Sequence, residues 1–286
     1  NEVFTIEKDA NKRDSVYWLI ARPVSLTEEE NIKYSKDDSV LNRQNTKEYK
    51  DSIDRVRNKF STGKVLLNGY YYRMNGDESF LKINSLSSAL LRYNTVQGFN
   101  PMLSPYFAKR FNEETGYFNV SSDINYSQAR DRINATLKSV YYYDWVRFQA
   151  VKIQAGSQIS QYNENKPIKE LINAAYTLLT KENYAKYFEK EFAKFKYRRE
   201  IVNGLMLSTE LEYQNRKALT NHTDFSLYPD NNKQFTSNNP VNPNNDAPAF
   251  ATHQAFLLDL KLNVTFKQQY ERYPTFKQIL GSKYPK

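Results

Sequence analysis

Residues 256–266 read FLLDLKLNVTF, and this stretch decides the fold because its side chains alternate between two chemical classes. One set of alternate positions holds Phe256, Leu258, Leu260, Leu262, Val264 and Phe266. The positions between them hold Leu257, Asp259, Lys261, Asn263 and Thr265, most of which are charged or polar. Successive side chains of a strand point to opposite faces of a sheet, so the pattern predicts a β-strand with one apolar and one polar face.

The same two-residue period recurs along the chain and predicts a mainly antiparallel β protein. We count eight candidate strands, at about 64–74, 80–93, 103–111, 117–127, 132–143, 146–161, 195–216 and 253–270. Several of them exceed the length of typical soluble strands and carry Tyr near their ends. Long alternating strands with terminal aromatics favour an antiparallel transmembrane β-barrel over a soluble β-sandwich or barrel.

Three segments differ from the strands. Residues 1–60 are predicted to be a helical lead-in, because Thr27 and Glu30 have the spacing of a capping box. Residues 167–190 open with a proline and carry an apolar stripe, which predicts an amphipathic helical insertion. Residues 217–252 are rich in Asn, Asp and Pro and predict one long exposed loop.

Outer-membrane barrels keep short turns in the periplasm and long loops outside the cell, so the loop predicts an orientation. If 217–252 is extracellular, counting eight strands backwards places four segments in the periplasm. These are the helix 167–190, the turn near Arg130, the turn 94–102 and the N-terminal 60 residues. The domain prediction is therefore a periplasmic helical linker over 1–60 and outer-membrane barrel strands over 61–286.

The composition excludes several chemistries. The 286 residues include no Cys and only two His, which rules out cysteine nucleophiles, thiolate metal sites and disulfides. No G-x-S-x-G serine motif or phosphate-binding loop occurs, and His222 and His253 lie outside any ligand-spaced cluster. We therefore expect no enzyme activity, no catalytic residue, no metal and no cofactor.

The charge and hydropathy add two further expectations. The net charge of +9 is spread along the chain and interleaved with acids, so no nucleic-acid partner is predicted. Aromatic residues make up 15% of the chain although its mean hydropathy is −0.78. Two-faced strands account for this pairing, and no apolar run is long enough for a membrane-spanning helix.

Three groups of residues are candidate sites. The first consists of Asn94, Thr95, Gly98 and Phe99. These residues are either a periplasmic contact turn for a partner or only a tight turn that needs its glycine. The second consists of polar residues expected in the barrel interior, namely Glu210, Glu212, Asp259, Lys261 and Lys267. They either line a channel or hold a plug, or they only pair with one another as a polar core. The third is a set of membrane-interface aromatics, or alternatively rings that stack on sugars or bases: Tyr70, Tyr71, Tyr141, Tyr143 and Trp145.

Several strings in this order resemble a family of large Gram-negative outer-membrane barrels of unknown function, often preceded by a carboxypeptidase-regulatory-like periplasmic domain. The strings are DSVYW (14–18), RPVSLTEEE (22–30), DSID (51–54) with NK (58–59), YNTVQGF (93–99), QYN (161–163) with PI (167–168), NYAKYFEK (183–190), IVNG (201–204) and LGSKYP (280–285). Each string alone is weakly specific, whereas their common order over nearly the whole chain is fairly specific.

The resemblance implies a longer protein, with a regulatory-like domain before this chain and further strands after it, and a barrel distantly similar to the BamA and TamA assembly barrels. This chain would then be the helical linker and about half of a barrel. An open half barrel leaves unpaired edges in lipid, so either further strands exist or the eight strands close on themselves.

The resemblance also bears on function, although the family's activity is not firmly assigned. It suggests a non-enzymatic accessory in outer-membrane protein assembly or envelope biogenesis, located in the outer membrane of a Gram-negative bacterium with a periplasmic N-terminal segment. The expected partners are outer-membrane lipid and other outer-membrane proteins or assembly subunits. Two alternatives stay open, namely a solute transport barrel or porin and a soluble β-rich glycan-binding module.

Overall fold

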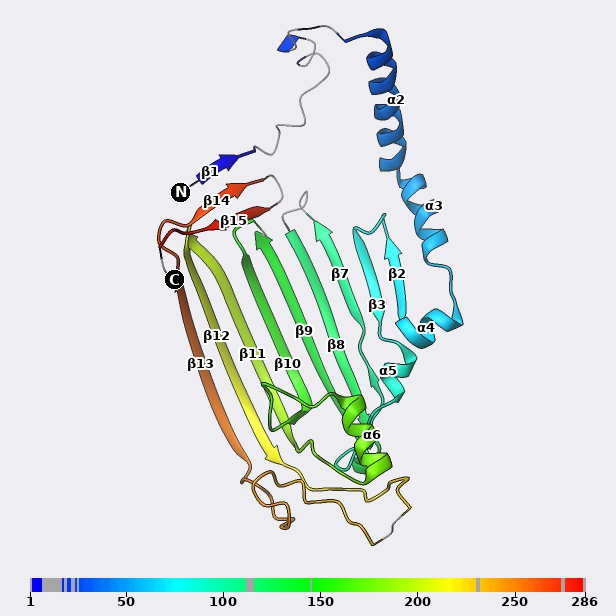
Figure 1. Cartoon of the computed structure of the whole chain (residues 1–286), viewed down its shortest axis with the longest axis vertical. Helices are drawn as coiled ribbons and strands as arrows, with labels where there is room; N and C mark the ends of the chain where they lie inside the picture. Colours follow the sequence, from blue (N-terminus) through cyan, green and yellow to red (C-terminus); the bar gives the residue numbers. More distant parts are fainter. Residues whose placement is uncertain are drawn as a thin grey trace.

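The protein forms one large curved antiparallel sheet with smaller elements at its ends (Figure 1). The computed structural model describes residues 2–6, 17, 20–21, 24, 26–111, 116–144, 146–229, 232–273 and 276–284. The strands of the large sheet are β2 (Tyr70–Met74), β3 (Ser79–Ile83), β6 (Met102–Leu103), β7 (Tyr106–Phe111), β8 (Gly116–Ser127), β9 (Arg132–Asp144), β10 (Gln149–Gln161), β11 (Tyr187–Val202), β12 (Leu205–Ala218) and β13 (His253–Val264).

The sheet order is β13-β12-β11-β10-β9-β8-β7-β3-β2, with β6 also paired to β8. All of these pairings are antiparallel, which confirms the prediction of a mainly β, antiparallel fold. β2 and β13 stay at opposite edges, so the described strands leave the sheet open. Of the two alternatives for a barrel, closure of these strands on themselves is not found among the described residues.

The predicted strand 195–216 is two strands, β11 and β12, joined by a tight turn at Asn203 and Gly204. The two-residue alternation of side chains continues across Asn203 and Gly204, so the pattern alone does not reveal the turn. Gly204 has φ +83°, and a Cβ there would lie 2.3 Å from the Thr265 carbonyl oxygen. This position therefore needs glycine.

Three other strand predictions were too long. The segment 64–74 begins as helix α4 (Thr62–Asn68), and 80–93 gives way to helix α5 (Leu86–Leu90) after β3. The strand predicted over 253–270 stops at Val264. The chain turns after it, and Lys267 in that turn has a left-handed conformation with φ 47°. Each error is at an end, where apolar residues continue after the backbone has left the sheet.

The N-terminal helices are α2 (Glu28–Asn45) and α3 (Lys47–Arg57). The predicted capping box is confirmed, since the Thr27 and Glu30 side chains each accept a hydrogen bond from the other's backbone N–H. Helix α3 packs on the β2–β3 hairpin, where the Asp54 carboxylate accepts the Gly76 N–H at 2.9 Å. Helix α2 has no buried residue and stands away from the sheet (Figure 1).

The predicted helix 167–190 is shorter in the structure. Helix α6 (Glu170–Thr180) ends at Lys181, which is left-handed with φ 55°, and residues 187–190 belong to β11. The remaining elements are a separate sheet of β1 (Glu2–Thr5), β14 (Gln269–Arg272) and β15 (Lys277–Gly281), a small pair of β4 (Tyr93–Asn94) and β5 (Gly98–Phe99), and a short 3-10 helix η1 (Gln128–Arg130).

The two ends of the large sheet differ. Tight turns at 75–78 and 203–204 lie at one end, here called the short-turn end. Helix α6, the 94–102 turn, η1 and the loop 219–252 lie together at the other, here called the loop end (Figure 1). The prediction that the long loop and the 167–190 helix occupy opposite ends is wrong, because β11 is one more crossing of the sheet than the eight-strand count allowed.

Candidate functional site

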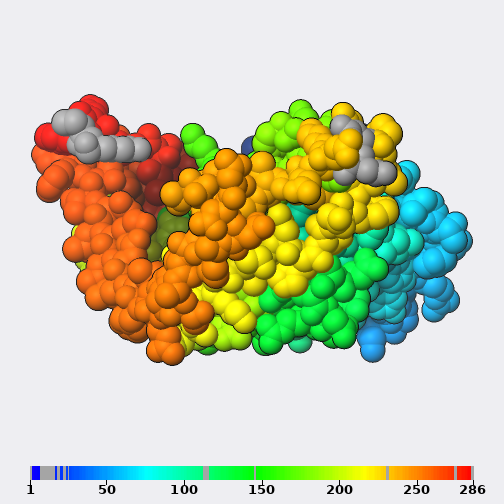
Figure 2. All heavy atoms as spheres, turned by 90° about the horizontal axis from the view of Figure 1, so that it is seen from below, coloured from blue at the N-terminus to red at the C-terminus, as the bar shows by residue number. Residues whose placement is uncertain are grey.

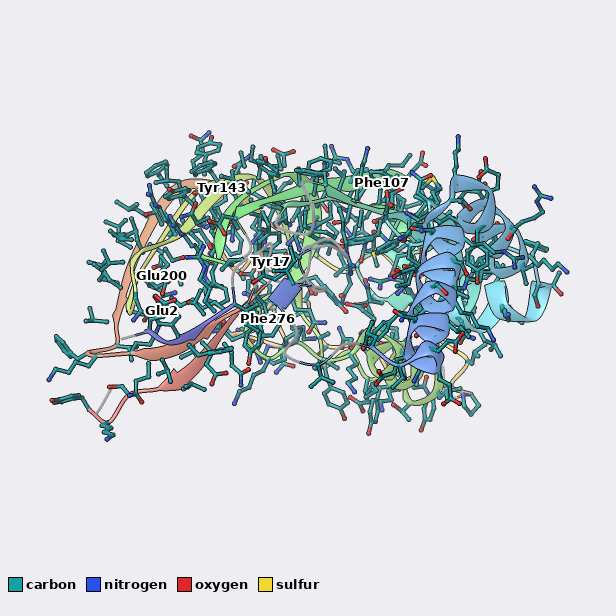
Figure 3. The ribbon with its side chains drawn as sticks, turned by 90° about the horizontal axis from the view of Figure 1, so that it is seen from above. Glu2, Tyr17, Phe107, Tyr143, Glu200 and Phe276 are labelled. Atoms are coloured by element: carbon teal, nitrogen blue, oxygen red, sulfur yellow. The ribbon has the colours of Figure 1, made fainter. Side chains whose placement is uncertain are left out.

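The sheet is an arch with two chemically different faces. Figure 3 shows Tyr143 outside the arch and Glu200 inside it, and we name the two faces outer and inner accordingly. One row across the outer face pairs Leu258 with Leu211, Leu211 with Phe195 and Phe195 with Ile153. Leu258 and Ile153 are more than half exposed, at 57% and 54%. The outer face therefore presents large apolar side chains to its surroundings.

The exposed apolar side chains of this face come from six neighbouring strands, β8 to β13, and a patch of that extent marks an interaction surface. Those exposed by 40% or more are Ile124, Tyr126, Ile133, Leu137, Ile153, Phe195, Tyr213, Phe256, Leu258, Leu260, Leu262 and Val264.

The inner face carries a ladder of ion pairs between β11 and β12. The Glu212 carboxylate lies 2.7 Å from Lys194 Nζ and 3.6 Å from Lys190 Nζ. The Glu210 carboxylate lies 2.9 Å from Lys194 and 3.0 Å from Lys196. Two of the predicted interior residues, Glu210 and Glu212, are thus held by lysines of the adjacent strand, as the reading of mutually satisfied polar side chains expects.

The other three predicted interior residues lie outside this ladder of β11 and β12, although Asp259 and Lys261 share its inner face. Asp259 and Lys261 pair with one another at 2.9 Å on the exposed edge strand β13. Lys267 lies in the turn after β13, and its Nζ donates to the Tyr284 hydroxyl at 3.0 Å. Lys267 is therefore not on the inner face, because the strand ends three residues before it.

The predicted interface aromatics do not form one group. Tyr70 packs on Phe60, whereas its neighbour Tyr71 stacks on Phe80 with ring centroids 4.7 Å apart. Tyr141 and Tyr143 follow alternate positions of β9 near its short-turn end. The rings of Tyr141 and Phe111 stack, and the Tyr143 hydroxyl donates to Tyr197 at 3.2 Å. Trp145 lies outside the described residues.

The predicted contact turn lies at the loop end. Residues 94–99 are here called the 94–99 knot, because hydrogen bonds to the Asn94 side chain hold them in a compact turn. The Asn94 side-chain oxygen accepts the N–H groups of Val96 and Gln97 at 3.0 and 2.8 Å. Gly98 has φ +69°, and a Cβ there would lie 3.0 Å from the Ala129 Cβ, so the turn needs its glycine.

The long loop covers this knot. The Thr95 hydroxyl donates to the Asn221 side chain at 2.6 Å, and the Thr95 carbonyl accepts the N–H of His222 at 2.9 Å. Asn94 and Thr95 are each 1% exposed, whereas Phe99 is 44% exposed. Of the four predicted contact residues, Phe99 is the one with a large side chain that a partner reaches without moving the loop.

Asn238 fastens the loop to the sheet. Its side-chain NH₂ donates to the carbonyls of Tyr187 and Leu219 at 2.7 and 2.6 Å, and its oxygen accepts the Tyr187 N–H at 2.9 Å. Around this amide, a small core is buried at the loop end and consists of Val96, Ala185, Tyr187 and Leu219. Three segments distant in sequence are therefore held by one buried amide and one apolar cluster.

Lys186 lies beside this core and is expected to titrate close to pH 8. Its Nζ donates to the Thr236 hydroxyl at 2.7 Å. Burial lowers the pKa of Lys186 from 10.5 to about 8, and the nearby Glu182 carboxylate offsets part of that shift. Between these two values the unfolded chain binds more protons, so stability is expected to rise with pH through that window. Reductive methylation with ¹³C-formaldehyde should give, besides the α-amino signal, one lysine methyl resonance that titrates near pH 8 and is missing in Lys186→Arg. A Lys186 resonance that titrates only near its ordinary pKa would contradict this placement.

A buried ion pair lies where β9 and β10 separate. Their pairing ends at Gly156 and Thr136, although β10 continues to Gln161 and β9 begins at Arg132. Into this split the Arg130 guanidinium donates to the Glu189 carboxylate at 2.7 Å, and both side chains are buried. The Asn134 amide also donates to Glu189, at 3.1 Å.

Sequence reasoning missed this pair, because Arg130 and Glu189 are 59 residues apart. Gly156 was the available signal, since an isolated glycine within a strand often marks a bulge or a close approach of two backbones. It has φ +138°, and a Cβ there would lie 2.1 Å from the Ala135 carbonyl oxygen. Beside the split lies a polar cavity of about 180 Å³ bordered by Asn134 and Ser157.

Each of the two histidines contacts a backbone carbonyl two residues before it. Nδ1 of His222 contacts the Thr220 carbonyl and Nδ1 of His253 contacts the Ala251 carbonyl. Within the described residues, no group of three or more His, Cys, Asp or Glu is arranged to hold a metal ion.

The comparisons with known proteins place the chain in a family. The sequence model of the C-terminal domain of DUF5686, described as a family of unknown function, matches residues 63–286. The chain belongs to this family. The match covers most of the chain and confirms the expected resemblance as far as a family of unknown function. The barrel and the carboxypeptidase-regulatory-like domain stay predictions.

No curated protein and no solved structure gives a significant match to this DUF5686 member. No helix among the described residues is long and apolar enough to cross a membrane.

Proposed function

We propose that this DUF5686 chain is a non-enzymatic outer-membrane protein that inserts its sheet into lipid and serves as an accessory in outer-membrane protein assembly or envelope biogenesis. The observation that carries the membrane part is the outer face. Its apolar side chains are exposed over strands β8 to β13, whereas the inner face of β11 and β12 pairs lysines with glutamates. Each Leu moved from water into lipid contributes roughly 1.5–3 kcal/mol.

The strand lengths support the same proposal. Strands β8 to β13 have 12 to 16 residues, whereas a membrane-spanning strand needs about 9–11. The shortest of these strands, with 12 residues, is about 40 Å long at a rise of about 3.3 Å per residue. When such a strand tilts by about 45°, it spans a hydrocarbon core of about 30 Å.

Insertion also sets a requirement at the edges. The edge strands β2 and β13 have one side without a strand partner in the large sheet. Unpaired backbone groups are too costly in lipid, so both edges need further strands when the sheet is embedded. Those strands come from the same protein or from another outer-membrane protein.

The proposal also assigns an orientation. Short turns face the periplasm and long loops face outward in outer-membrane barrels. The short-turn end, with α3 packed on its 75–78 hairpin, then faces the periplasm. The loop end then faces outward and carries the 94–99 knot. The proposed location of the knot is therefore external, whereas the sequence predicted a periplasmic one.

Brominated lipid should distinguish the two faces of β13. With Trp18 and Trp145 replaced by Phe, a tryptophan at Leu260 is expected to be strongly quenched by brominated acyl chains. Lys261→Trp is the matched control, because it is the next residue of the same strand but points to the inner face. Weak quenching of both tryptophans, or equal quenching of the two, would exclude the proposed insertion.

Depletion separates the assembly role from transport. A strain depleted of this protein is expected to lose other folded outer-membrane proteins, measured as heat-modifiable bands in outer-membrane fractions. The purified protein is expected to conduct little in planar bilayers. Conductance that is large and accompanied by unchanged levels of other outer-membrane proteins would favour the transport alternative instead.

A further inference from the structure

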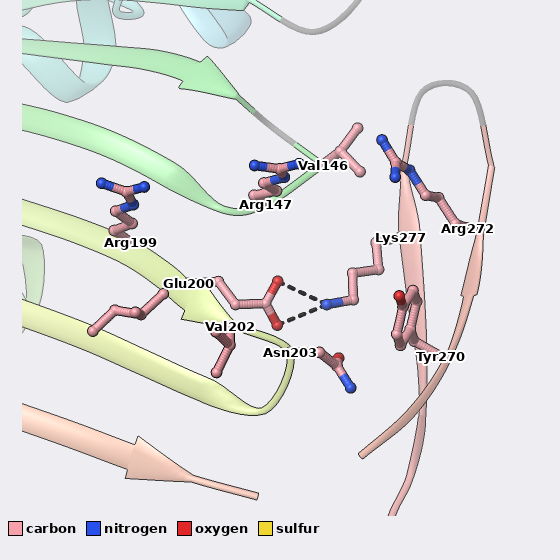
Figure 4. Close-up of a pocket in the computed structure, with 10 residues that line it drawn as sticks. Val146, Arg147, Arg199, Glu200, Val202, Asn203, Tyr270, Arg272 and Lys277 are labelled. Atoms are coloured by element: carbon pink, nitrogen blue, oxygen red, sulfur yellow. Dashed lines mark hydrogen bonds and ion pairs between the residues drawn. The ribbon is translucent and has the colours of Figure 1, made fainter. Parts of the chain in front are cut away.

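A second pocket lies at the short-turn end, away from the loop and the ion-pair ladder. Its volume is about 350 Å³, and it lies between the ends of β10 and β11 and the small sheet of β14 and β15 (Figure 4). Ligand pockets for small molecules begin at about this size. Figure 2 views the molecule from the opposite, loop end, so this pocket and the long loop with the 94–99 knot lie at different ends of the sheet.

The lining of this pocket is strongly cationic. Its charged side chains are Arg147, Arg199, Arg272 and Lys277 against the single carboxylate of Glu200. This leaves an excess of three positive charges around one opening.

The carboxylate is already neutralised. Lys277 Nζ lies 2.7 Å from both Glu200 oxygens, and both side chains are buried, at 6% and 7% exposure. The three arginines are therefore expected to interact only weakly with the Glu200 carboxylate. In the view of Figure 4, the guanidinium group of Arg147 lies between those of Arg199 and Arg272, and the three come from the turn before β10, from β11 and from β14.

The arginines have few other anionic partners. Arg147 lies 3.7 Å from the Asp144 carboxylate in a pair that is partly exposed and therefore weak. Arg199 interacts with the Tyr197 hydroxyl. Arg272 has no carboxylate within ion-pair distance among the residues that the structure describes.

We propose that this pocket binds a phosphate-bearing anion. A guanidinium presents its N–H groups in a planar fork that matches phosphate oxygens, and such charge-assisted bonds are about twice as strong as neutral ones. An excess of three positive charges suits a phosphate dianion better than a single carboxylate. The inference concerns the pocket alone and does not rest on membrane insertion.

The bound phosphate has two sources, a lipid headgroup or a soluble phosphate. Ile201 and Val202 also line the pocket and are exposed, at 47% and 60%. Apolar side chains beside the guanidinium groups fit acyl or glycerol carbons next to a headgroup, but they equally fit a soluble organic phosphate. The experiment therefore has one arm for each source.

The test uses the full chain in maltoside micelles, which carry no phosphate. Binding of inorganic phosphate and of short-chain phosphatidylglycerol is measured by calorimetry at low salt. Each of Arg199→Gln and Arg272→Gln is expected to weaken binding about tenfold, since each removes charge-assisted hydrogen bonds. The single variant Arg43→Gln, on the exposed face of α2, is the charge-matched control, and it should bind as the parent does.

Tight phosphatidylglycerol binding with weak inorganic phosphate binding supports the lipid source, and the reverse supports a soluble phosphate. Charge-conserving Arg199→Lys/Arg272→Lys should retain part of the affinity, which separates loss of the anion site from loss of the fold. The proposal is overturned if neither probe binds the parent protein, or if the control variant loses as much affinity as the arginine variants.

Discussion

Arg130→Met should lower the free energy of unfolding by about 3–5 kcal/mol, because it leaves the Glu189 carboxylate buried without its main partner. Arg130 and Glu189 side chains are 5% and 7% exposed, and their contact is 2.7 Å long. Asn134 would be the main remaining buried donor to that carboxylate, at 3.1 Å. A neutral amide does not offset the loss of a buried cation.

Arg132 provides the matched control for this experiment. It approaches the same carboxylate, but at 3.5 Å and with its side chain 57% exposed. Arg132→Met is therefore expected to cost about 1 kcal/mol or less, as exposed ion pairs do. Both values come from urea unfolding of the protein in detergent, followed by far-UV circular dichroism. Equal losses in the two variants would show that burial does not govern this pair.

A second variant separates the charge from the packing. Arg130→Met/Glu189→Leu removes both charges and fills the split between β9 and β10 with apolar atoms. Replacing both members of a buried pair by apolar side chains is often neutral or stabilising. The double variant is therefore expected to recover much of the stability lost in Arg130→Met. No recovery would assign the loss to packing instead of the uncompensated carboxylate.

The two faces of the sheet were predictable because their signal is local. Leu258, Leu260 and Leu262 alternate with Asp259 and Lys261 in a single strand, and the period of a strand fixes which side chains share a face. The Thr27 cap was predictable for the same reason, since both of its partners lie within one helical turn.

The turn at Gly204 was missed although its signal is also local. Leu205 resumes the alternation at once after Ile201 and Val202, so a period-two count continues through the hairpin. The Asn203-Gly204 dipeptide within this stretch is nevertheless a strong hairpin signal. That single omission also reversed the placement of α6 relative to the long loop.

The arrangement of the loop end was not predictable from sequence. Thr95 contacts Asn221 and Arg130 contacts Glu189, across 126 and 59 residues. Nothing in the local pattern of a polar segment says which other polar segment it will meet. Only the register of the intervening strands brings these side chains together.

Asn238→Ala should release the long loop from the sheet, and we expect a local loss of about 2–4 kcal/mol. The alanine removes three hydrogen bonds from a side chain that is 1% exposed. It also leaves the Tyr187 N–H and the carbonyls of Tyr187 and Leu219 without these partners in a buried site. Unsatisfied buried groups make this change more costly than loss of an exposed amide.

Hydrogen exchange measures this release directly. The backbone N–H of His222 donates to the Thr95 carbonyl and reports whether the loop is docked. A loss of about 2 kcal/mol accelerates its exchange roughly 30-fold when exchange follows local opening. Asn244→Ala is the matched control, because Asn244 lies in the same loop and is exposed. Its exchange pattern should match that of the parent.

The same variant decides whether the 94–99 knot depends on the loop. Since Asn221 and His222 bind Thr95, undocking of the loop exposes Asn94 and Thr95 as well. Faster exchange of the Val96 and Gln97 amides in Asn238→Ala would therefore show that loop and knot open as one unit. Unchanged exchange at those two amides, with fast exchange at His222, would show that the Asn94 side chain holds the knot without the loop. Unchanged exchange at all three positions would contradict the assignment of Asn238 as the fastener.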